Sequence, residues 1–485
     1  MDTQGTRESE SQHLSRELNT PLPTIRRWRA VVLLLGRVAT WAVMSPPRAG
    51  VAAWSRLRPV QQLVVGFALY AVVGAILLCL PWSRGGPVSA IDNLFNAVSA
   101  ISTTGLTTVN VSSAYSTLGE IVLLVLFQIG GVGFMTLSSL LILARGKPLT
   151  QTSISALKAG FSVPHYFVMQ HFLTHVVVFT VVCEAVGAGI LWWRFAMLGV
   201  EHAAWSGVFH SVSAFCTAGF SLNSDSLASF AGDWVVNLVI GVQAYLGAIG
   251  FIVVQDVWYS IKLRERMLTF TSKVILSMTG AIFIAGTAWM FYFEPVMRSL
   301  PPDERLLASA FQVMTASTTA GFNTVPISAM SSGGLVMLLI AMVIGASPSG
   351  TGGGIKTTTV SAILGNLVSV LRGRQGVIWL GHEIPMVRVL LAFAASSLYL
   401  IGLAIGVLLL CMTDDHEFLP LVFEAASAIG TVGLSMGITG ELSTAGKFII
   451  IALMFAGRCG PLTIGLALLR ADQAEQVPRR DDLAV

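Results

Sequence analysis

The sequence predicts an all-α integral membrane protein in which one chain repeats a helix, re-entrant helix, helix unit four times, with eight spanning helices around a pseudo-fourfold pore. Two observations predict this class. Of the 485 residues, 54% are hydrophobic and only 11% are charged, and the mean hydropathy is +0.75. Such a charged fraction is about half that of soluble proteins. In addition, four similar segments that each end in glycine alternate with pairs of apolar stretches.

Eight apolar stretches are long enough to cross a hydrocarbon core, which requires about 20 helical residues. They lie near 60–80, 118–144, 168–198, 234–261, 270–293, 335–371, 386–411 and 446–470, and the sixth is interrupted. The polar first 25 residues show no cleavable signal. The weakly apolar run at 28–44 contains two arginines, which favours an interfacial helix over a ninth span.

The four glycine-terminated segments carry the repeat. Each has Phe ten residues before its glycine, Ser or Thr six before, Ala five before and Thr two before. The glycines are Gly105, Gly219, Gly321 and Gly433, separated by 114, 102 and 112 residues. With about 10 to 12 residues before the glycine, each segment is too short to span and is interpreted as re-entrant. The alternative is that these small residues only mediate helix packing.

The repeats divide the chain into units at 56–160, 161–264, 265–378 and 379–485, after an N-terminal extension at 1–55. Of the 29 Lys and Arg residues, 22 lie in the termini and in the linkers between units. The positive-inside rule then predicts that both termini, including the C-terminal tail, are cytoplasmic in a multi-pass membrane protein. The positive net charge of +4 reflects this orientation, and no nucleic-acid partner is implied.

Each Thr-x-Gly turn is expected to line an aqueous path, because non-helical backbone at membrane depth must face water or protein. Glycine can adopt positive φ, so that successive carbonyls point the same way. Four such turns would form a carbonyl ring of the kind that replaces the hydration shell of potassium. The short helices would also aim their negative C-terminal ends at the axis and favour a cation. No acidic residue lies within the four turns.

Further motifs are QIGGVGF at 128–134, YLGAIGF at 245–251, GASPSGTGGGIKTTT at 345–359 and FAGRCGPLT at 455–463. With these motifs the chain resembles the Trk, Ktr and HKT superfamily of potassium transporters from about residue 57 to 469, and most closely the membrane subunits of bacterial Ktr uptake systems. The resemblance implies a homodimer in contact with membrane lipid and a cytoplasmic nucleotide-binding regulatory ring of the RCK type. Potassium would be the transported substrate, with no cofactor bound covalently and the nucleotide on the partner.

The resemblance also assigns a selectivity filter. It falls on Thr103, Thr104 and Gly105; Thr217, Ala218 and Gly219; Thr319, Ala320 and Gly321; and Thr431, Val432 and Gly433. In the family, serine in place of the first glycine goes with sodium transport, so four glycines favour potassium. Leu106 and Leu434 stand where the other two repeats have Phe, and Cys216 and Gly430 interrupt a hydroxyl column. We expect side chains at these positions to face away from the ion path.

The sixth apolar stretch cannot be one continuous helix. Its glycines and proline oppose helix formation by roughly 8 kcal/mol in total. The resemblance makes 345–357 an intramembrane gating loop, whose residues include Gly345, Ser347, Pro348, Gly350, Gly352, Gly353, Gly354 and Lys356. A static kink between packed half-helices is the alternative. Lys356 is expected either to pair with a neighbour or to lie near the cytoplasmic exit.

Arg458 lies in the last apolar stretch, where a charge facing lipid would cost at least about 2.5 kcal/mol. It is expected to face the pore and to guard its cytoplasmic half together with the loop. The alternative is a buried structural role with a carboxylate or with loop carbonyls. Glu120, Glu184, His210, Asp256 and Glu424 are weaker candidates for coupling sites, and the alternative for each is a helix-end or interhelix hydrogen bond.

These observations predict potassium uptake through a channel-like pore that is gated by the intramembrane loop and by the regulatory subunit. One alternative is a sodium or sodium-coupled HKT-like transporter. A second is a secondary solute carrier, although such carriers usually have two inverted repeats rather than four copies in one direction. An enzyme is not expected, because the sequence shows no Walker-type phosphate loop and its five cysteines lack metal-ligand spacing.

Overall fold

The computed structural model describes residues 57, 59–133, 169–263 and 268–468. The predicted extension at 1–55, its helix at 28–44 and the tail beyond residue 468 lie outside these residues. Regular structure in the described ranges is helical except for one antiparallel hairpin of β1 (Val377–Trp379) and β2 (His382–Ile384). The mostly helical fold predicted from the sequence is therefore confirmed.

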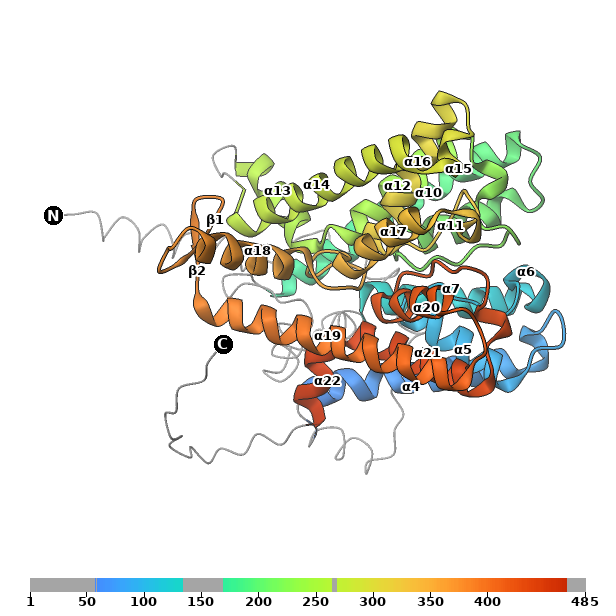
Figure 1. The fold of residues 1–485 in the computed structure, drawn as a ribbon. Helices are drawn as coiled ribbons and strands as arrows, with labels where there is room; N and C mark the ends of the chain where they lie inside the picture. Colours follow the sequence, from blue (N-terminus) through green and yellow to red (C-terminus); the bar gives the residue numbers. More distant parts are fainter. Residues whose placement is uncertain (1–56, 58, 134–168, 264–267, 469–485) are drawn as a thin grey trace.

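Each unit has a long first helix, then a short helix, and then a second helix. This order occurs four times along the chain (Figure 1). The long first helices are α4 (Pro59–Cys79), α10 (Met169–Met197), α14 (Phe270–Phe293) and α19 (Met386–Thr413). The short helices are α5 (Ala90–Ile101), α11 (Ala203–Phe215), α16 (Pro302–Thr318) and α20 (Phe418–Gly430). The second helices begin with α7 (Thr117–Val132), α12 (Trp234–Ala248), α17 (Ser332–Ile344) and α21 (Thr444–Cys459). Three continue as α13 (Phe251–Leu263), α18 (Thr357–Leu371) and α22 (Pro461–Leu468).

Short helical turns connect these elements. They are η1 (Pro81–Ser83), α6 (Val111–Ala114), η2 (Ala228–Phe230), α15 (Pro295–Arg298), η3 (Ile327–Ala329) and η4 (Thr439–Glu441). Each second helix starts at a residue whose side chain accepts a hydrogen bond from a first-turn amide; these caps are Ser116, Asp233, Ser331 and Ser443. Such caps satisfy amides that would otherwise lack partners and stabilise each helix start by about 1 kcal/mol.

The helices pack as a closed ring of four units. Each long helix contacts the short helix that follows it, as in α4 with α5 and α10 with α11. Each second helix contacts the short helix of the next unit; these pairs are α7 with α11, α12 with α16, and α17 with α20. The last second helix, α21, contacts the first short helix, α5, which closes the ring. The short helices therefore lie inside, and the long helices lie outside.

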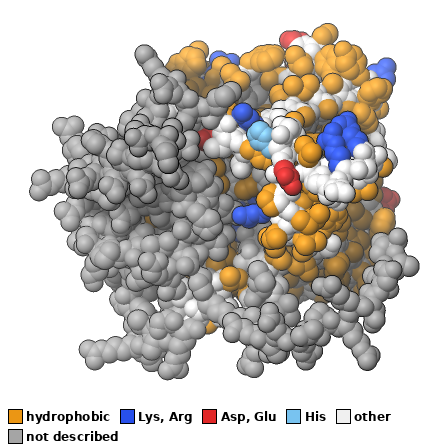
Figure 2. Space-filling model, turned by 90° about the vertical axis from the view of Figure 1, so that its left-hand side faces the viewer, with side chains coloured by type: hydrophobic (Ala, Val, Ile, Leu, Met, Phe, Trp, Pro, Cys, Tyr) orange, Lys and Arg blue, Asp and Glu red, His pale blue; other side chains and the backbone are white. Residues whose placement is uncertain are grey.

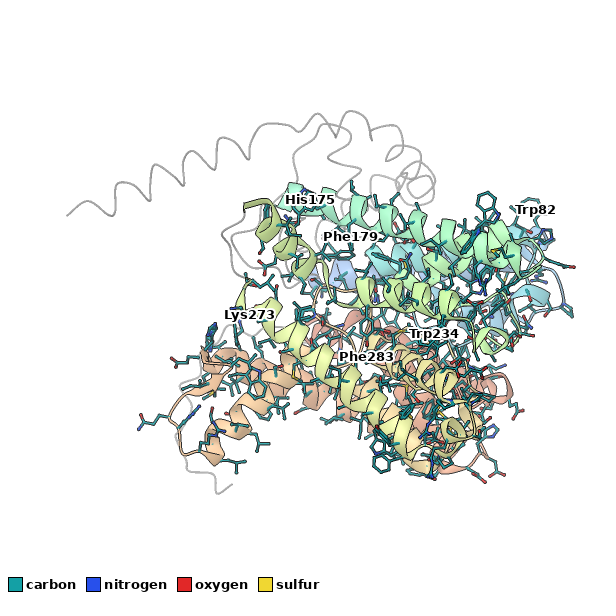
Figure 3. The ribbon with its side chains drawn as sticks, turned by 90° about the horizontal axis from the view of Figure 1, so that it is seen from above. Trp82, His175, Phe179, Trp234, Lys273 and Phe283 are labelled. Atoms are coloured by element: carbon teal, nitrogen blue, oxygen red, sulfur yellow. The ribbon has the colours of Figure 1, made fainter. Side chains whose placement is uncertain are left out.

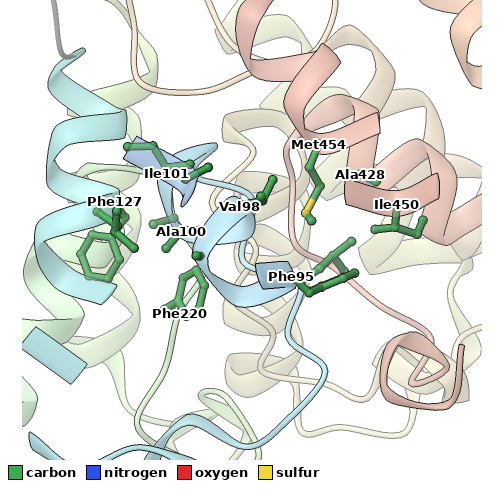
Figure 4. Packing of buried hydrophobic residues seen from close by; sticks show 14 of the residues in the cluster. Phe95, Val98, Ala100, Ile101, Phe127, Phe220, Ala428, Ile450 and Met454 are labelled. Carbon is green, nitrogen blue, oxygen red and sulfur yellow. The ribbon is translucent and has the colours of Figure 1, made fainter. Parts of the chain in front are cut away.

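The core surrounds the short helices. The Phe ten residues before each repeat glycine is at most 3% exposed, as at Phe95 and Phe311. Figure 4 shows Phe95 and Val98 of α5 facing Ile450 and Met454 of α21, with Phe127 on the other side of α5. Phe127 also packs edge-on against Phe209, with ring centroids 5.5 Å apart. The repeated Phe thus ties each short helix to its neighbours.

The outer surface of the long helices is apolar. Exposed side chains include Ile284 (70%), Leu408 (62%) and Trp192 (56%). Among the described helices, four are long and apolar enough to cross a membrane, or five when the bent pair α12 and α13 counts as one span. The four are the long first helices. Since α7 reaches the edge of the described residues, eight spans remain a prediction.

The two ends of the molecule differ. Trp82 and Trp234 lie toward one end and His175 and Lys273 toward the other (Figure 3). Figure 2 faces the end that carries the hairpin and shows groups of basic side chains among hydrophobic ones. Tryptophans near the membrane–water interfaces and basic residues gathered on one side are typical of a membrane-spanning protein.

Two predicted spans are not single straight helices. In the stretch at 234–261, α12 and α13 meet at 93° across Gly250. The stretch at 446–470 breaks between α21 and α22 at Gly460. Both glycines have positive φ (+93° and +83°), which ends the helix because only glycine adopts it without steric cost. Gly133 after α7 and Gly345 after α17 also have positive φ, so every second helix ends at such a glycine.

Candidate functional site

The four repeat glycines meet at the centre of the ring. A β-carbon added to Gly105 would lie 2.9 Å from the Cα of Gly219, and one on Gly219 would lie 3.1 Å from the Cα of Gly321. One on Gly321 would lie 3.2 Å from Gly433, and one on Gly433 would lie 3.1 Å from Gly105. The four turns therefore lie around one axis in chain order. A side chain at any of these positions would enter the neighbouring turn.

Each Thr-x-Gly turn is the end of a short helix. The amide of its middle residue donates to the carbonyl five residues earlier, at 2.8 or 2.9 Å; the donors are Thr104, Ala218, Ala320 and Val432. The threonine before it has positive φ, and the glycine after it does too; the threonines are Thr103, Thr217, Thr319 and Thr431, with φ from +49° to +58°. This pattern ends a helix in the manner of a Schellman motif.

The positive φ of the four threonines is a feature that the sequence analysis missed. Glycine usually occupies the left-handed position after a helix, and each threonine costs about 1 to 2 kcal/mol there. The same strained conformation occurs four times around one axis. In each turn the threonine and the glycine have positive φ, whereas the residue between them has an ordinary φ. Successive carbonyls therefore need not point to opposite sides, as they do in a strand. Strain of this kind persists where function requires a set geometry.

The serine six residues before the glycine supports the turn in two repeats. Its hydroxyl accepts a hydrogen bond from the amide of the glycine, at 3.1 Å between Ser99 and Gly105 and at 3.0 Å between Ser427 and Gly433. In the second repeat Ser213 donates to the carbonyl of Phe220 at 2.8 Å. In these three repeats the serine hydroxyl therefore fixes the backbone next to the glycine.

A cavity of about 400 Å³ opens on one side of the ring. All four repeat glycines line it, and the other lining residues are mostly polar, including Asn110, Asn223, Asp225 and Asn323. The four turns are therefore open to this polar cavity on one side. The cavity lies on the side of the turns away from the loop at 345–357.

The loop at 345–357 closes the opposite side. Thr351 is fully buried and accepts hydrogen bonds from Thr103, at 3.3 Å to its carbonyl, and from Thr217, at 3.1 Å to its hydroxyl. The amide of Gly353 donates to the hydroxyl of Thr319 at 3.1 Å. A β-carbon on Gly353 would collide with the hydroxyl of Thr431. The loop thus touches the threonine of every turn.

Helix breaks in neighbouring repeats hold this loop. Where α12 ends, the carbonyls of Gly247 and Ala248 accept hydrogen bonds from the amides of Thr351 (3.0 Å) and Ser347 (3.1 Å). Carbonyls at a helix end lack intrahelical partners, so the loop satisfies groups that the break at Gly250 leaves free. The bend of the second repeat and the loop of the third repeat are therefore parts of one arrangement.

Arg458 and Lys356 bind carbonyls around the loop. The guanidinium of Arg458 donates to the carbonyls of Thr351 and Gly130, and to that of Gly131 at 3.4 Å. The ammonium of Lys356 donates to Gly352 at 2.6 Å and to Gly353 at 3.4 Å. Arg458 therefore links the loop to the end of α7. Lys356 binds carbonyls of its own loop, and its place near the cytoplasmic exit stays a prediction.

The other predicted candidates make local contacts. Glu120 accepts a hydrogen bond from Trp205 at 2.6 Å, and Asp256 accepts one from the amide of Thr269 at 2.8 Å. Glu184 accepts one from Gln128 at 3.2 Å behind the second turn, where Cys216 also lies. These contacts match the structural alternative, and the structure does not bring these three carboxylates into the ring.

Comparisons with known proteins identify the family of the chain. Residues 61–477 match the TrkH family, described as cation transport proteins. The Ktr system potassium uptake protein B of Bacillus subtilis is 37% identical over 430 residues, covering 87% of this chain and 95% of that protein. The protein of the same name from Vibrio alginolyticus is 33% identical, covering 84% and 91%. The potassium/sodium uptake protein NtpJ of Enterococcus hirae is 33% identical, covering 87% and 95%.

The fold has a counterpart among solved structures. The crystal structure of the potassium transporter TrkH from Vibrio parahaemolyticus superposes with a TM-score of 0.69 at 19% sequence identity, covering 92% of this chain and 99% of that one. The family match spans most of the chain, and the ring of four turns lies within it. The chain therefore belongs to the TrkH family of cation transport proteins.

Proposed function

We propose that the protein takes up potassium across the bacterial plasma membrane through the centre of the ring. The observation that supports this most is the closed ring of four glycine turns, open on one side to a polar cavity. Backbone carbonyls from Thr103–Gly105 and its three equivalents would replace the hydration shell of the ion. The membrane potential would drive uptake with about 2.3 kcal/mol per charge per 100 mV.

The relatives support potassium as the substrate. Two of them carry the name Ktr system potassium uptake protein B. All four ring positions are glycine, and a bulkier residue would intrude on the neighbouring turn. Sodium remains the second candidate, because the name of the Enterococcus hirae relative includes both ions. The solute-carrier alternative has no support in a family of cation transport proteins.

The proposed topology has eight spanning segments in four units, with both termini in the cytoplasm. The cavity then faces outward, and the loop at 345–357 faces the cytoplasmic half of the pore. The name "Ktr system" of the relatives supports a partner subunit. We propose a homodimer that works with a cytoplasmic nucleotide-binding ring, with the nucleotide on that partner.

The arrangement of loop 345–357 corresponds to a closed pore. Thr351 and Gly353 occupy the space directly beneath the turns, where an ion leaving the filter would pass. Opening requires the loop to leave the threonines, and with them the carbonyls of Gly247 and Ala248. Arg458 binds the loop carbonyl of Thr351, so it acts both as a tether and as a positive charge beside the path.

Growth rescue tests this function. The full chain is expressed in a bacterium that lacks potassium uptake, with and without a co-expressed regulatory subunit of the Ktr type. Growth at limiting potassium is expected at least with the subunit. Failure in both conditions, with the protein present in the membrane, would contradict potassium uptake. Uptake of sodium in the same cells would then favour the second candidate.

A further inference from the structure

One buried polar residue recurs at the same place in each short helix, nine residues before the repeat glycine. The four residues are Asn96, His210, Gln312 and Glu424, and each is 0% exposed. Their chemistry differs, yet none is apolar. A buried polar side chain is costly unless it forms hydrogen bonds. Four of them at equivalent positions indicate a shared task that does not depend on one functional group.

Each side chain reaches the outer limb, meaning the six residues that follow the glycine. Nε2 of His210 lies 2.9 Å from the hydroxyl of Ser221. Nε2 of Gln312 donates to the carbonyl of Val325 at 3.2 Å. The short helix runs toward the glycine and the limb runs back, so these residues lie at similar depth. Each bond therefore spans the turn from its helix to its limb.

Asn96 makes the same link in the first repeat. Its Oδ1 accepts a hydrogen bond from the amide of Thr108 at 3.4 Å, and its Nδ2 donates to the hydroxyl of Tyr115 at 3.0 Å. Burial raises the pKa of the Tyr115 hydroxyl to about 12, so it keeps its proton and donates to Asn93 at 3.0 Å. The first limb is thus held by a connected set of neutral groups.

Glu424 makes the most contacts of this kind in the fourth repeat. One carboxylate oxygen accepts a hydrogen bond from Ser435, and the other accepts one from Thr439 at 3.0 Å. Ser435 also accepts a bond from the amide of Gly437 at 2.8 Å. Ser435, Thr439 and Ser221 all line the outer cavity. Only one hydroxyl therefore separates Glu424, and likewise His210, from the cavity next to the ring.

We propose that this row of four residues positions the outer end of the filter, and that Glu424 and His210 set ion selectivity through Ser435 and Ser221. These serines lie two residues after Gly433 and Gly219, so a shift of the limb moves the carbonyls of the ring. A site that must distinguish similar ions needs its groups held to within about 0.5 Å. This inference rests on the proposed potassium function.

The test measures the ratio of potassium to sodium uptake by the full chain in reconstituted vesicles. Replacing Glu424→Ala or His210→Ala is expected to lower the ratio at least about fivefold, which corresponds to the loss of one hydrogen bond worth about 1 kcal/mol. The ratio does not depend on how much protein folds. An unchanged ratio in the alanine variants would mean that the row only stabilises the fold, and the proposal would be wrong.

A conservative variant of Glu424 separates the effect of its hydrogen bonds from the effect of its charge. Hydroxyls both donate and accept, so glutamine can keep the bonds to Ser435 and Thr439, and this chain already has glutamine at the equivalent Gln312. Glu424→Gln is expected to retain the ratio of the unchanged protein. Loss of selectivity in this variant would assign the effect to the carboxylate charge and overturn a positioning role.

Two further variants complete the design. Ser435→Ala removes the hydroxyl that donates to Glu424 from the cavity side. The same fall in the ratio of potassium to sodium uptake is expected. This variant therefore tests the proposal even if Glu424→Ala does not fold. Gln243→Leu is the matched control, because Gln243 is buried and donates to Cys183 (2.7 Å) and Ser211 (3.1 Å) rather than to a limb. Its ratio should not change. If the unchanged protein carries no potassium even when a Ktr-type regulatory subunit is reconstituted with it, the proposed function fails instead of this inference.

Discussion

The cavity side of the ring, which we propose to be the outer side, and the loop side, which we propose to be the inner side, use the fourfold repeat in different ways. On the outer side, all four turns share the same φ pattern and the same helix-ending hydrogen bond. On the inner side, the third repeat departs from the second and the fourth. Its second helix is interrupted by residues 345–356, whereas α12 resumes as α13 and α21 resumes as α22 almost at once.

The difference extends to how the second helices meet the short helices. In three repeats a glycine lies three residues before the helix break, where a β-carbon would collide with the last carbonyls of a short helix; these are Gly130, Gly247 and Gly457. The third repeat has Met342 there. An ion is surrounded by equal groups only if the turns are equal. Within the described residues, the loop beneath the turns comes from the third repeat.

Gly105→Ser makes the first turn unlike the other three. Of the variants considered, it should have the largest effect on transport. Gly105 has φ +93°, and a β-carbon would lie 2.9 Å from the Cα of Gly219. Displacement of the ring is expected to lower the ratio of potassium to sodium uptake at least about 30-fold, or about 2 kcal/mol. Gly199→Ser is the control, because Gly199 also has positive φ (+73°) but open space around it. A preserved ratio in Gly105→Ser would contradict the carbonyl filter.

Arg458→Ala should affect the inner side without touching the turns. It removes the donor to Thr351 and to Gly130, and each lost charged hydrogen bond is worth about 1.5 to 3 kcal/mol. Potassium flux is expected to rise about tenfold, with an unchanged ratio of potassium to sodium. Arg458→Lys keeps the charge with fewer donors, so an intermediate flux is expected. Unchanged flux in Arg458→Ala would argue against its role as a barrier.

Gly353→Ala should displace the same loop by a smaller step. The added methyl group would collide with the hydroxyl of Thr431, so the loop must move away from the fourth turn. We expect potassium flux to increase about threefold, as the closed state loses roughly 0.7 kcal/mol. Gly189→Ala, a helical position with no atom within 4 Å, is the control. A decrease in flux would indicate that the loop does not block the path.

Gly460→Ala should have the smallest effect, because it strains the backbone without a close contact. The nearest atoms to an added β-carbon lie 3.4 Å away, and φ is +83°. The expected cost is about 1 kcal/mol of stability, seen as a lower thermal unfolding midpoint in detergent. Selectivity should be unchanged. A changed ratio of potassium to sodium would show that the inner breaks and the outer turns are coupled.

Much of the site could be predicted from the sequence because its signals are local. The spacing of Phe, Ser or Thr, Ala, Thr and Gly appears in each short segment, and the glycines and Pro348 of the sixth stretch oppose a helix within a few residues. The bends at Gly250 and Gly460 could have been suspected from the recurrence of glycine in YLGAIGF and FAGRCG. Apolar composition there masked them, since a bent and a straight helix have the same hydropathy.

By itself, the sequence determined the membrane-protein class, the four equivalent turns and the position of the interruption, because hydropathy and repeat spacing are written along the chain. Only the tertiary structure decided which atoms lie beneath the turns, where Arg458 of the fourth repeat meets Thr351 of the third and Gly130 of the first. It also decided that the row from Asn96 to Glu424 reaches the outer limbs. Such contacts join residues that are far apart in the chain, and they arise only when the four units close into a ring.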